Sequence, residues 1–231
     1  MAAEADRLFE EIDQLLTEES CTAIEDEKRR SVHIAIGKAG QLVEMEPNNA
    51  DAHHILAICW YHHPSKTPER SQQIRHHLNV VLALNPDHQF ANQYLGYINF
   101  DDGNYSESLS YFERTDFDYF DSLDQKWRTL KARELIIVCK LRLGYASFNL
   151  WELRAFVAAY QEQLRLDDAN TAWPLELRVC AEWLFERGVQ ADSPVIDTIM
   201  RFFDELGFLK TVKNQRLLDS WNGGRPLPPS R

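Results

Sequence analysis

A repeated phrase is the feature that most constrains how this chain can fold. Residues 43–57 read VEMEPNNADAHHILA, and residues 82–96 read LALNPDHQFANQYLG. Each phrase runs from an apolar stretch through a proline and a polar turn to a leucine followed by a small residue, and the two prolines stand 39 residues apart. A repeat of this period is typical of stacked helical hairpins, because one hairpin alone cannot bury its apolar face.

The pattern of apolar residues predicts an all-α fold. Apolar side chains recur at the helical spacing of about 3.6 residues, whereas the alternation typical of strands is nearly absent. Glycine and proline are scarce, with nine of each in 231 residues, and several lie between helical patterns. We expect a degenerate helix pair over 5–46, two helices within 50–86 joined by an exposed connector over 62–71, and further helices over 122–143, 149–165, 174–187, 194–206 and 209–221. Asn149 and Ser193 are the expected N-caps, and Pro174 and Pro194 are the expected first helical residues.

Residues 89–115 carry the most specific packing pattern. Small and apolar residues recur along two helical stretches separated by the turn Gly103–Asn104–Tyr105. The packing positions are Ala91, Leu95 and Gly96 in the first stretch and Ser108, Phe112 and Thr115 in the second. This pattern resembles the tetratricopeptide repeat family, whose hairpins span about 34 residues. Residues 50–86 resemble it with a longer connector, through Ala52, Leu56, Ala57, Trp60, Ile74, Leu78 and Val81, and residues 5–46 resemble it weakly.

The resemblance implies a right-handed α-solenoid of antiparallel helix hairpins. We expect about five helix pairs plus a C-terminal capping helix in a single domain over residues 1–221. Residues 5–115 form its recognisable repeats, and residues 122–221 form degenerate hairpins and the cap. The alternative for this second half is a separate helical bundle. The remainder, 222–231, is predicted to be a flexible tail rich in proline and glycine.

The resemblance also implies a binding groove, because first helices of successive repeats in this family line a concave surface that holds a peptide or partner helix. The corresponding positions are Asp51, His54, Ile58, Tyr61 and His62 in one repeat and Phe90, Gln93, Tyr97, Phe100 and Asp101 in the next. Tyrosine and phenylalanine offer large contact areas at low entropic cost. The alternative is that Tyr97 and Phe100 pack against the next helix. One subtype of the family clamps a terminal carboxylate with Lys and Asn, but His54, Ile58 and Tyr94 stand at those positions, so no clamp is expected.

The net charge of −11 is unevenly distributed. Such an acidic chain is not expected to bind nucleic acid, because phosphate backbones are held by clustered Lys and Arg. Acidic residues are concentrated in residues 1–48 and 87–125. Within the second block, Asp116, Asp118, Asp121 and Asp124 alternate with aromatic residues. This acidic edge predicts a basic partner, and the alternative is a solvated turn with buried aromatics.

Histidine and cysteine are the residue types of this chain that could ligate a transition metal or act as nucleophiles. Six of the eight histidines form adjacent pairs within 53–77, but neighbours on a helix point about 100° apart. Only two-ligand spacings occur, at Cys59/His63 and Asp51/His54, whereas a closed zinc site needs four ligands. We therefore expect no metal and no cofactor. The four cysteines show no CxxC spacing, which favours reduced thiols in a cytoplasmic protein.

These observations predict a non-catalytic protein–protein interaction module. No linear catalytic motif occurs, so no catalytic residue is assigned. No apolar run of 18 residues occurs, so membrane insertion is not expected. Two alternatives stay open: a bacterial immunity or chaperone-type protein that neutralises a basic toxin or secreted effector, and a scaffold subunit of a larger assembly. The sequence leaves the oligomeric state open.

Overall fold

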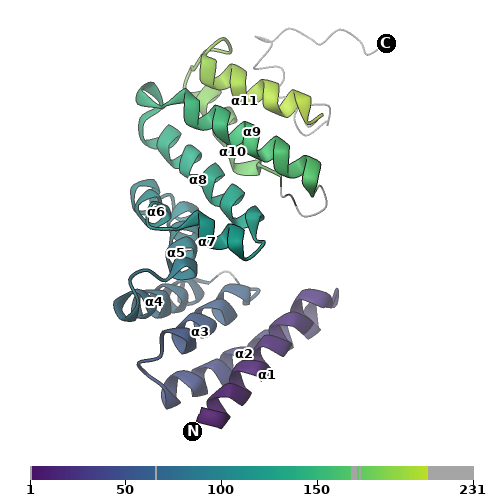
Figure 1. Ribbon diagram of the computed structural model, residues 1–231, viewed down its shortest axis with the longest axis vertical. Coiled ribbons are helices and arrows are strands. Elements are labelled where there is room, and N and C mark those ends of the chain that lie inside the picture. The colour runs from purple at the N-terminus through teal and green to yellow at the C-terminus, as the bar shows by residue number, and fades with distance from the viewer. Residues whose placement is uncertain (1, 66, 168–170, 172, 208–231) are drawn as a thin grey trace. The chain divides into compact units, whose positions relative to one another are not determined.

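The fold is helical throughout the part of the chain that the structure describes. The computed structural model describes residues 2–65, 67–167, 171 and 173–207. These residues contain eleven α-helices, one short 3₁₀-helix and no strand (Figure 1). The all-α prediction is thus confirmed for them, whereas the helix predicted over 209–221 and the tail over 222–231 lie outside the described residues.

The helices divide between two compact units. The first unit comprises Met1–Asp102 and Glu113–Thr115, and the second comprises Gly103–Phe112 and Asp116–Arg231. The repeat that best fits the packing pattern, residues 89–115, therefore contributes its first helix to one unit and its second helix to the other. That residues 1–221 form one continuous repeat domain stays a prediction.

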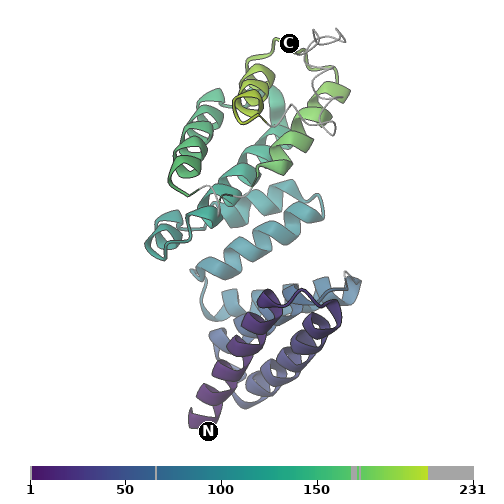
Figure 2. The ribbon, with the colours of Figure 1, turned by 90° about the vertical axis from the view of Figure 1, so that its right-hand side faces the viewer.

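In the first unit each helix packs on the next one in sequence. Its helices are α1 (Ala2–Cys21), α2 (Glu25–Met45), α3 (Ala50–His62), α4 (Pro68–Leu84) and α5 (Gln89–Asp101). Figures 1 and 2 show α1 and α2 side by side. Fully buried Ile12, Leu42 and Cys59 bring α1, α2 and α3 into one apolar core. Burial of apolar surface therefore follows chain order here, as stacked hairpins require.

Local capping explains where α3 and α4 begin. Asn49 is the N-cap of α3, and its side chain accepts the backbone N–H of Asp51 at 2.9 Å. Thr67 caps α4 by accepting the N–H of Arg70 at 3.2 Å, and Pro68 is the first helical residue. The connector predicted over 62–71 is therefore too long at both ends, because its last residues form the first turn of α4.

Two arginines of α4 fasten this helix to its neighbours. The Nε of Arg70 donates to the carbonyl of Trp60 at 3.0 Å, near the C-terminal end of α3. At the end of α5, Arg75 donates to Asn99 Oδ1 at 3.1 Å and to Asp102 Oδ2 at 2.5 Å. A guanidinium is suited to both places, because the last carbonyls of a helix lack intrahelical donors and carry partial negative charge. Helix α4 is thereby hydrogen-bonded to both α3 and α5.

The second unit is organised around one central helix. Its elements are α6 (Tyr105–Phe112), α7 (Phe117–Ser122), α8 (Lys126–Gly144), the 3₁₀-helix η1 (Tyr145–Ser147), α9 (Leu150–Leu166), α10 (Leu175–Glu186) and α11 (Pro194–Glu205). Helix α8 contacts α6, α7, α9 and α10, and α11 packs on α9 and α10 (Figure 1). This arrangement differs from the sequential packing of the first unit.

The helix starts predicted in the second unit are partly correct. Asn149 caps α9 by accepting the N–H of Trp151 at 3.0 Å, as expected. Ser193 occupies the N-cap position of α11, but its side chain makes no cap bond, because its hydroxyl instead meets the hydroxyl of Tyr145. Pro174 is the N-cap of α10 and not its first helical residue. The helix predicted over 122–143 starts later, at Lys126, because a separate short helix, α7, ends just before it.

Candidate functional site

Aromatic rings of α3 and α5 meet on one side of the first unit. The ring of His54 lies 5.6 Å from that of Phe90, and the ring of Tyr61 lies 4.9 Å from that of Tyr94. Tyr94 in turn meets Tyr97 at 6.2 Å in an edge-to-face contact. We call these five residues the aromatic face. Tyr94 is 8% exposed and the other four are half-buried, so the rings stabilise one another while keeping part of their surface open.

The helical period explains why these rings share a side. His54, Ile58 and Tyr61 are spaced by four and three residues on α3, and Phe90 and Tyr97 are spaced by seven on α5. Ile58 and Phe100 are half-buried, whereas Asp51 and Asp101 are exposed, at the first turn of α3 and the last residue of α5. Most of the predicted groove set therefore has surface that a partner could reach.

Two members of the predicted set are placed differently. Gln93 is 0% exposed, so its side chain belongs to the interior and has no free surface. His62 is half-buried and its Nδ1 lies 3.1 Å from Glu19 Oε2, on α1. The side chain of His62 thus links α3 to α1. The position of a residue within the repeat pattern cannot distinguish such a residue from one that faces a groove.

Sequence reasoning missed one residue of this face and one beside it. Tyr94, which is absent from the predicted groove set, joins Tyr61 to Tyr97 within the face. His88 is the N-cap of α5: its Nδ1 accepts the N–H of Ala91 at 3.1 Å, and its ring lies 4.7 Å from His54. Burial lowers the pKa of His88, and the nearby Asp51 carboxylate opposes that shift. The sequence signal for this cap was that His88 stands directly before the first helical residue, which is the N-cap position.

The four acidic-edge residues have mostly local roles in the second unit. Asp116 caps α7 by accepting the N–H of Asp118 at 3.0 Å. Asp121 accepts the hydroxyl hydrogen of Thr129 at 2.8 Å, which ties α7 to α8. Asp124 ends the turn after α7 with a positive φ of 57°. Asp118 is exposed on the first turn of α7. The spacing of these aspartates thus follows from capping and turn geometry as much as from any partner.

Asp124 gives a direct test of this turn. The left-handed conformation costs an L-residue about 1 kcal/mol, and glycine adopts it freely. Asp124→Gly is expected to be more stable than Asp124→Ala by about 1 kcal/mol, which denaturant unfolding of the two variants measures. Both substitutions remove the same charge, so equal stabilities would contradict a conformational role for this position.

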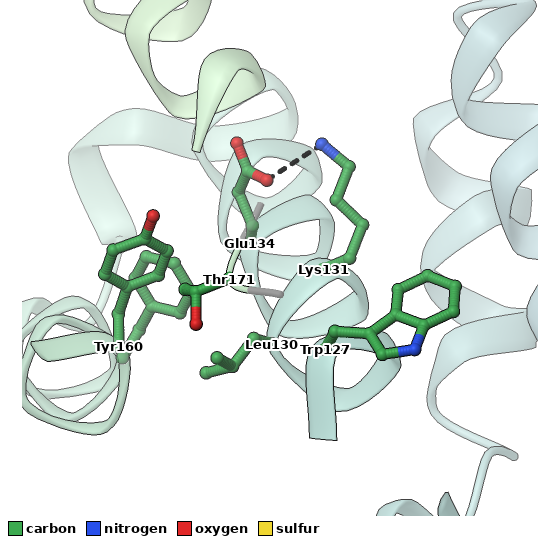
Figure 3. A pocket seen from close by; sticks show the side chains of 7 residues that line it. Trp127, Leu130, Lys131, Glu134, Tyr160 and Thr171 are labelled. Carbon is green, nitrogen blue, oxygen red and sulfur yellow. Dashed lines mark hydrogen bonds and ion pairs between the residues drawn. The ribbon is translucent and has the colours of Figure 1, made fainter. Parts of the chain in front are cut away.

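A buried carboxylate is the most unusual group of the second unit (Figure 3). Glu134 on α8 is 2% exposed, and its Oε2 accepts a hydrogen bond from the ammonium of Lys131 at 2.9 Å. Its Oε1 accepts the backbone N–H of Leu177 at 2.9 Å, within the first turn of α10. Burial raises the pKa of Glu134, and the Lys131 charge opposes the shift. The adjoining cavity, bordered by Trp127, Tyr160 and Thr171, encloses about 10 Å³, which is about one water molecule.

Glu134 therefore acts as an N-cap supplied by another helix. Pro174 stands at the N-cap position of α10 and provides no side-chain bond, so the first turn needs an acceptor from elsewhere. The sequence held a signal for this role: Glu134 lies on the apolar stripe of α8 with Leu130 and Val138, four residues to either side. A charged residue on such a stripe requires a partner.

The other groups of the described residues with potential chemistry are metal-ligating side chains and thiols. No group of three or more His, Cys, Asp or Glu side chains among residues 2–65, 67–167, 171 and 173–207 is placed to hold a metal ion. Burial raises the pKa of Cys59 and of Cys180 to about 12 and that of Cys139 to about 11, so these thiols stay protonated at neutral pH. No helix within the described ranges has the length and apolar character needed to cross a membrane.

Comparison with protein-family models and with curated proteins finds no match for this chain. Functional inference therefore rests on the residues of this chain and on their geometry.

Proposed function

We propose that this chain is a non-catalytic protein-interaction module that binds an extended peptide or a partner segment on the aromatic face. The ring contacts between α3 and α5, in the two sets His54–Phe90 and Tyr61–Tyr94–Tyr97, carry the proposal. Clustered Tyr and Phe side chains with open surface are typical of binding anchors, because they combine large contact area with few rotatable bonds.

The proposal includes a tetratricopeptide-like solenoid as the scaffold of this face. Support comes from the residues that the repeat pattern places between helices: Ala52, Ala57 and Ala91 are fully buried, as are the apolar positions Leu78 and Leu95. Small residues at these positions allow close approach of neighbouring helices, which sets the spacing of successive first helices. The sequential packing of α1 to α5 is consistent with the same scaffold.

The charge around the aromatic face favours a partner with apolar anchors and basic flanks. Exposed Asp51 and Asp101 lie on the same helices as the rings. Charges at the rim of an interface act mainly on association rate and on selectivity, whereas buried aromatic anchors supply most of the affinity.

A peptide-display selection tests this function. Random peptides selected against the full chain are expected to lose at least about thirtyfold in affinity for the Tyr97→Ala/Phe100→Ala variant, because two aromatic anchors each contribute about 1 kcal/mol or more. Trp151→Ala is the matched control, since this exposed aromatic side chain belongs to the second unit. Circular dichroism checks that the double variant keeps its helicity.

The binding proposal fails if selected peptides bind the double variant and the original chain equally well. Peptides that instead lose affinity with Trp151→Ala would assign binding to the second unit. Enrichment of Lys and Arg among the selected peptides, together with weaker binding at higher salt, is expected from the rim charges.

A further inference from the structure

Every histidine of the chain lies in the first unit. The sequence contains eight histidines, and all of them precede residue 89, whereas the second unit has none. Six of them meet ring to ring across different segments. The three ring pairs are His33–His63 with centroids 5.0 Å apart, His53–His77 at 5.2 Å and His54–His88 at 4.7 Å. These pairs connect α3, or its C-cap residue His63, to α2, to α4 and to the N-cap of α5.

The His53–His77 pair is buried and cannot accommodate two protonated rings. His53 Nε2 lies 3.0 Å from the carbonyl oxygen of Pro47, and a carbonyl only accepts, so this nitrogen carries the hydrogen. The Nδ1 of neutral His53 is then an acceptor, and His77 Nδ1–H donates to it across 3.0 Å. The two side chains are 6% and 8% exposed. If both rings were protonated, two N–H groups and two positive charges would face each other in the interior.

One further histidine also uses an unprotonated nitrogen. Nδ1 of His88 accepts the N–H of Ala91 as the N-cap of α5, so protonation removes the cap and places positive charge at a helix N-terminus. Nδ1 of His63 lies 3.2 Å from the backbone nitrogen of Ser65 and 3.4 Å from its carbonyl oxygen, so this nitrogen has a partner with or without a hydrogen. Protonation of His88 therefore costs a hydrogen bond in addition to like-charge repulsion within its ring pair.

Neighbouring groups modify this response in both directions. His76, whose ring lies 4.9 Å from that of His77, adds positive charge when protonated. Asp51 favours the protonated form of His88, and Glu19 Oε2 lies 3.1 Å from His62 Nδ1. His33 donates from Nδ1 to the carbonyl of Arg29 at 2.7 Å and keeps that bond when protonated. Acid thus weakens the three ring pairs through like-charge repulsion, and Asp51 offsets part of that effect at His88.

We propose that the first unit is an acid-sensitive element in which protonation of the three histidine pairs loosens α3 from α2, α4 and α5. Burial, together with the charges of His76 and His53, lowers the pKa of His77 from 6.5 to about 4. A base whose pKa is lowered by folding contributes stability above pH 6.5, and that contribution is lost as the pH falls from 6.5 towards 4. His54 belongs to the aromatic face, so a partner bound there would be released by the same change, a consequence that rests on the proposed binding function.

Hydrogen–deuterium exchange of the full chain tests the proposal without a partner. Protection factors, corrected for the intrinsic effect of pH, are compared between about pH 7.5 and about pH 5, a range in which ordinary carboxylates stay ionised. The His77 shift alone predicts that peptides of α3 and α4 lose about thirtyfold in protection. Peptides from α9 and α11 serve as the internal control, because the second unit has no histidine and these two helices carry neither Glu134 nor the N–H that it accepts.

Two variants test whether the buried His53–His77 pair causes the loss of protection at low pH. His53→Gln/His77→Gln keeps hydrogen-bonding side chains that do not titrate, and it is expected to reduce the loss of protection at least about threefold. His76→Gln removes an exposed histidine whose charge contributes to the low pKa of His77 but leaves the buried pair intact, so it is expected to change that loss by less than about twofold, well below the double variant. The proposal is overturned if both units of the original chain lose protection equally, or if the first unit keeps its protection. Both outcomes are measured on the original chain, so the test holds even if the double variant does not fold.

Discussion

Glu134→Ala is expected to lower the free energy of unfolding by about 3 kcal/mol. The substitution leaves the N–H of Leu177 without its acceptor at a helix start where the N-cap position offers no replacement. It also removes the partner of the Lys131 ammonium, whose side chain is 29% exposed and can reach water, which limits the cost of that loss. Denaturant unfolding followed by circular dichroism measures the change.

Two companion variants separate the hydrogen bond from the charge. Glu134→Gln keeps a carbonyl oxygen for the N–H of Leu177 but loses the ion pair, and a cost of about 1 kcal/mol is expected. Glu186→Gln removes the same charge from an exposed position of α10 and is expected to change stability by less than about 0.5 kcal/mol. If Glu134→Ala and Glu186→Gln were equally mild, Glu134 would not cap α10.

Local patterns predicted the helices and much of their buried side. Small and apolar residues such as Ala57, Leu78 and Leu95 are buried where the repeat pattern placed them, because helical spacing alone decides which residues share a side. Caps were predictable for the same reason, as Asn149 illustrates. Ser193 failed as a cap because Tyr145, 48 residues away in sequence, engages its hydroxyl.

The histidines illustrate what local patterns could not supply. Their adjacency in the sequence suggested pairs such as His53–His54, but each member of that pair meets a different partner, His77 and His88 respectively. These partners are 24 and 34 residues away, so the contacts depend on how the helices pack. The charges of the acidic edge likewise looked like one surface, whereas Asp116 caps α7 and Asp121 bonds to Thr129 of α8; a basic partner for this edge stays a prediction.

Phe202→Ala is expected to have the largest effect of any single substitution considered, a loss of about 4 kcal/mol in the free energy of unfolding. Phe202 on α11 is 1% exposed. Its ring makes edge-to-face contacts with Tyr160 at 5.3 Å and with Phe156 at 6.2 Å, both on α9, and it stacks on Phe203 at 5.5 Å. Truncation removes these contacts and leaves a cavity that rigid neighbouring rings cannot fill.

Two further variants separate the effect of side-chain volume from the effect of burial. Phe202→Leu retains most of the apolar volume and is expected to cost about 1 kcal/mol, chiefly through lost ring contacts. Trp151→Ala truncates an even larger aromatic residue of α9, but that side chain is 72% exposed and should change stability by less than about 0.5 kcal/mol. A cost for Trp151→Ala close to that for Phe202→Ala would mean that Trp151 is covered in solution, which would assign an occupied interface to that side of α9.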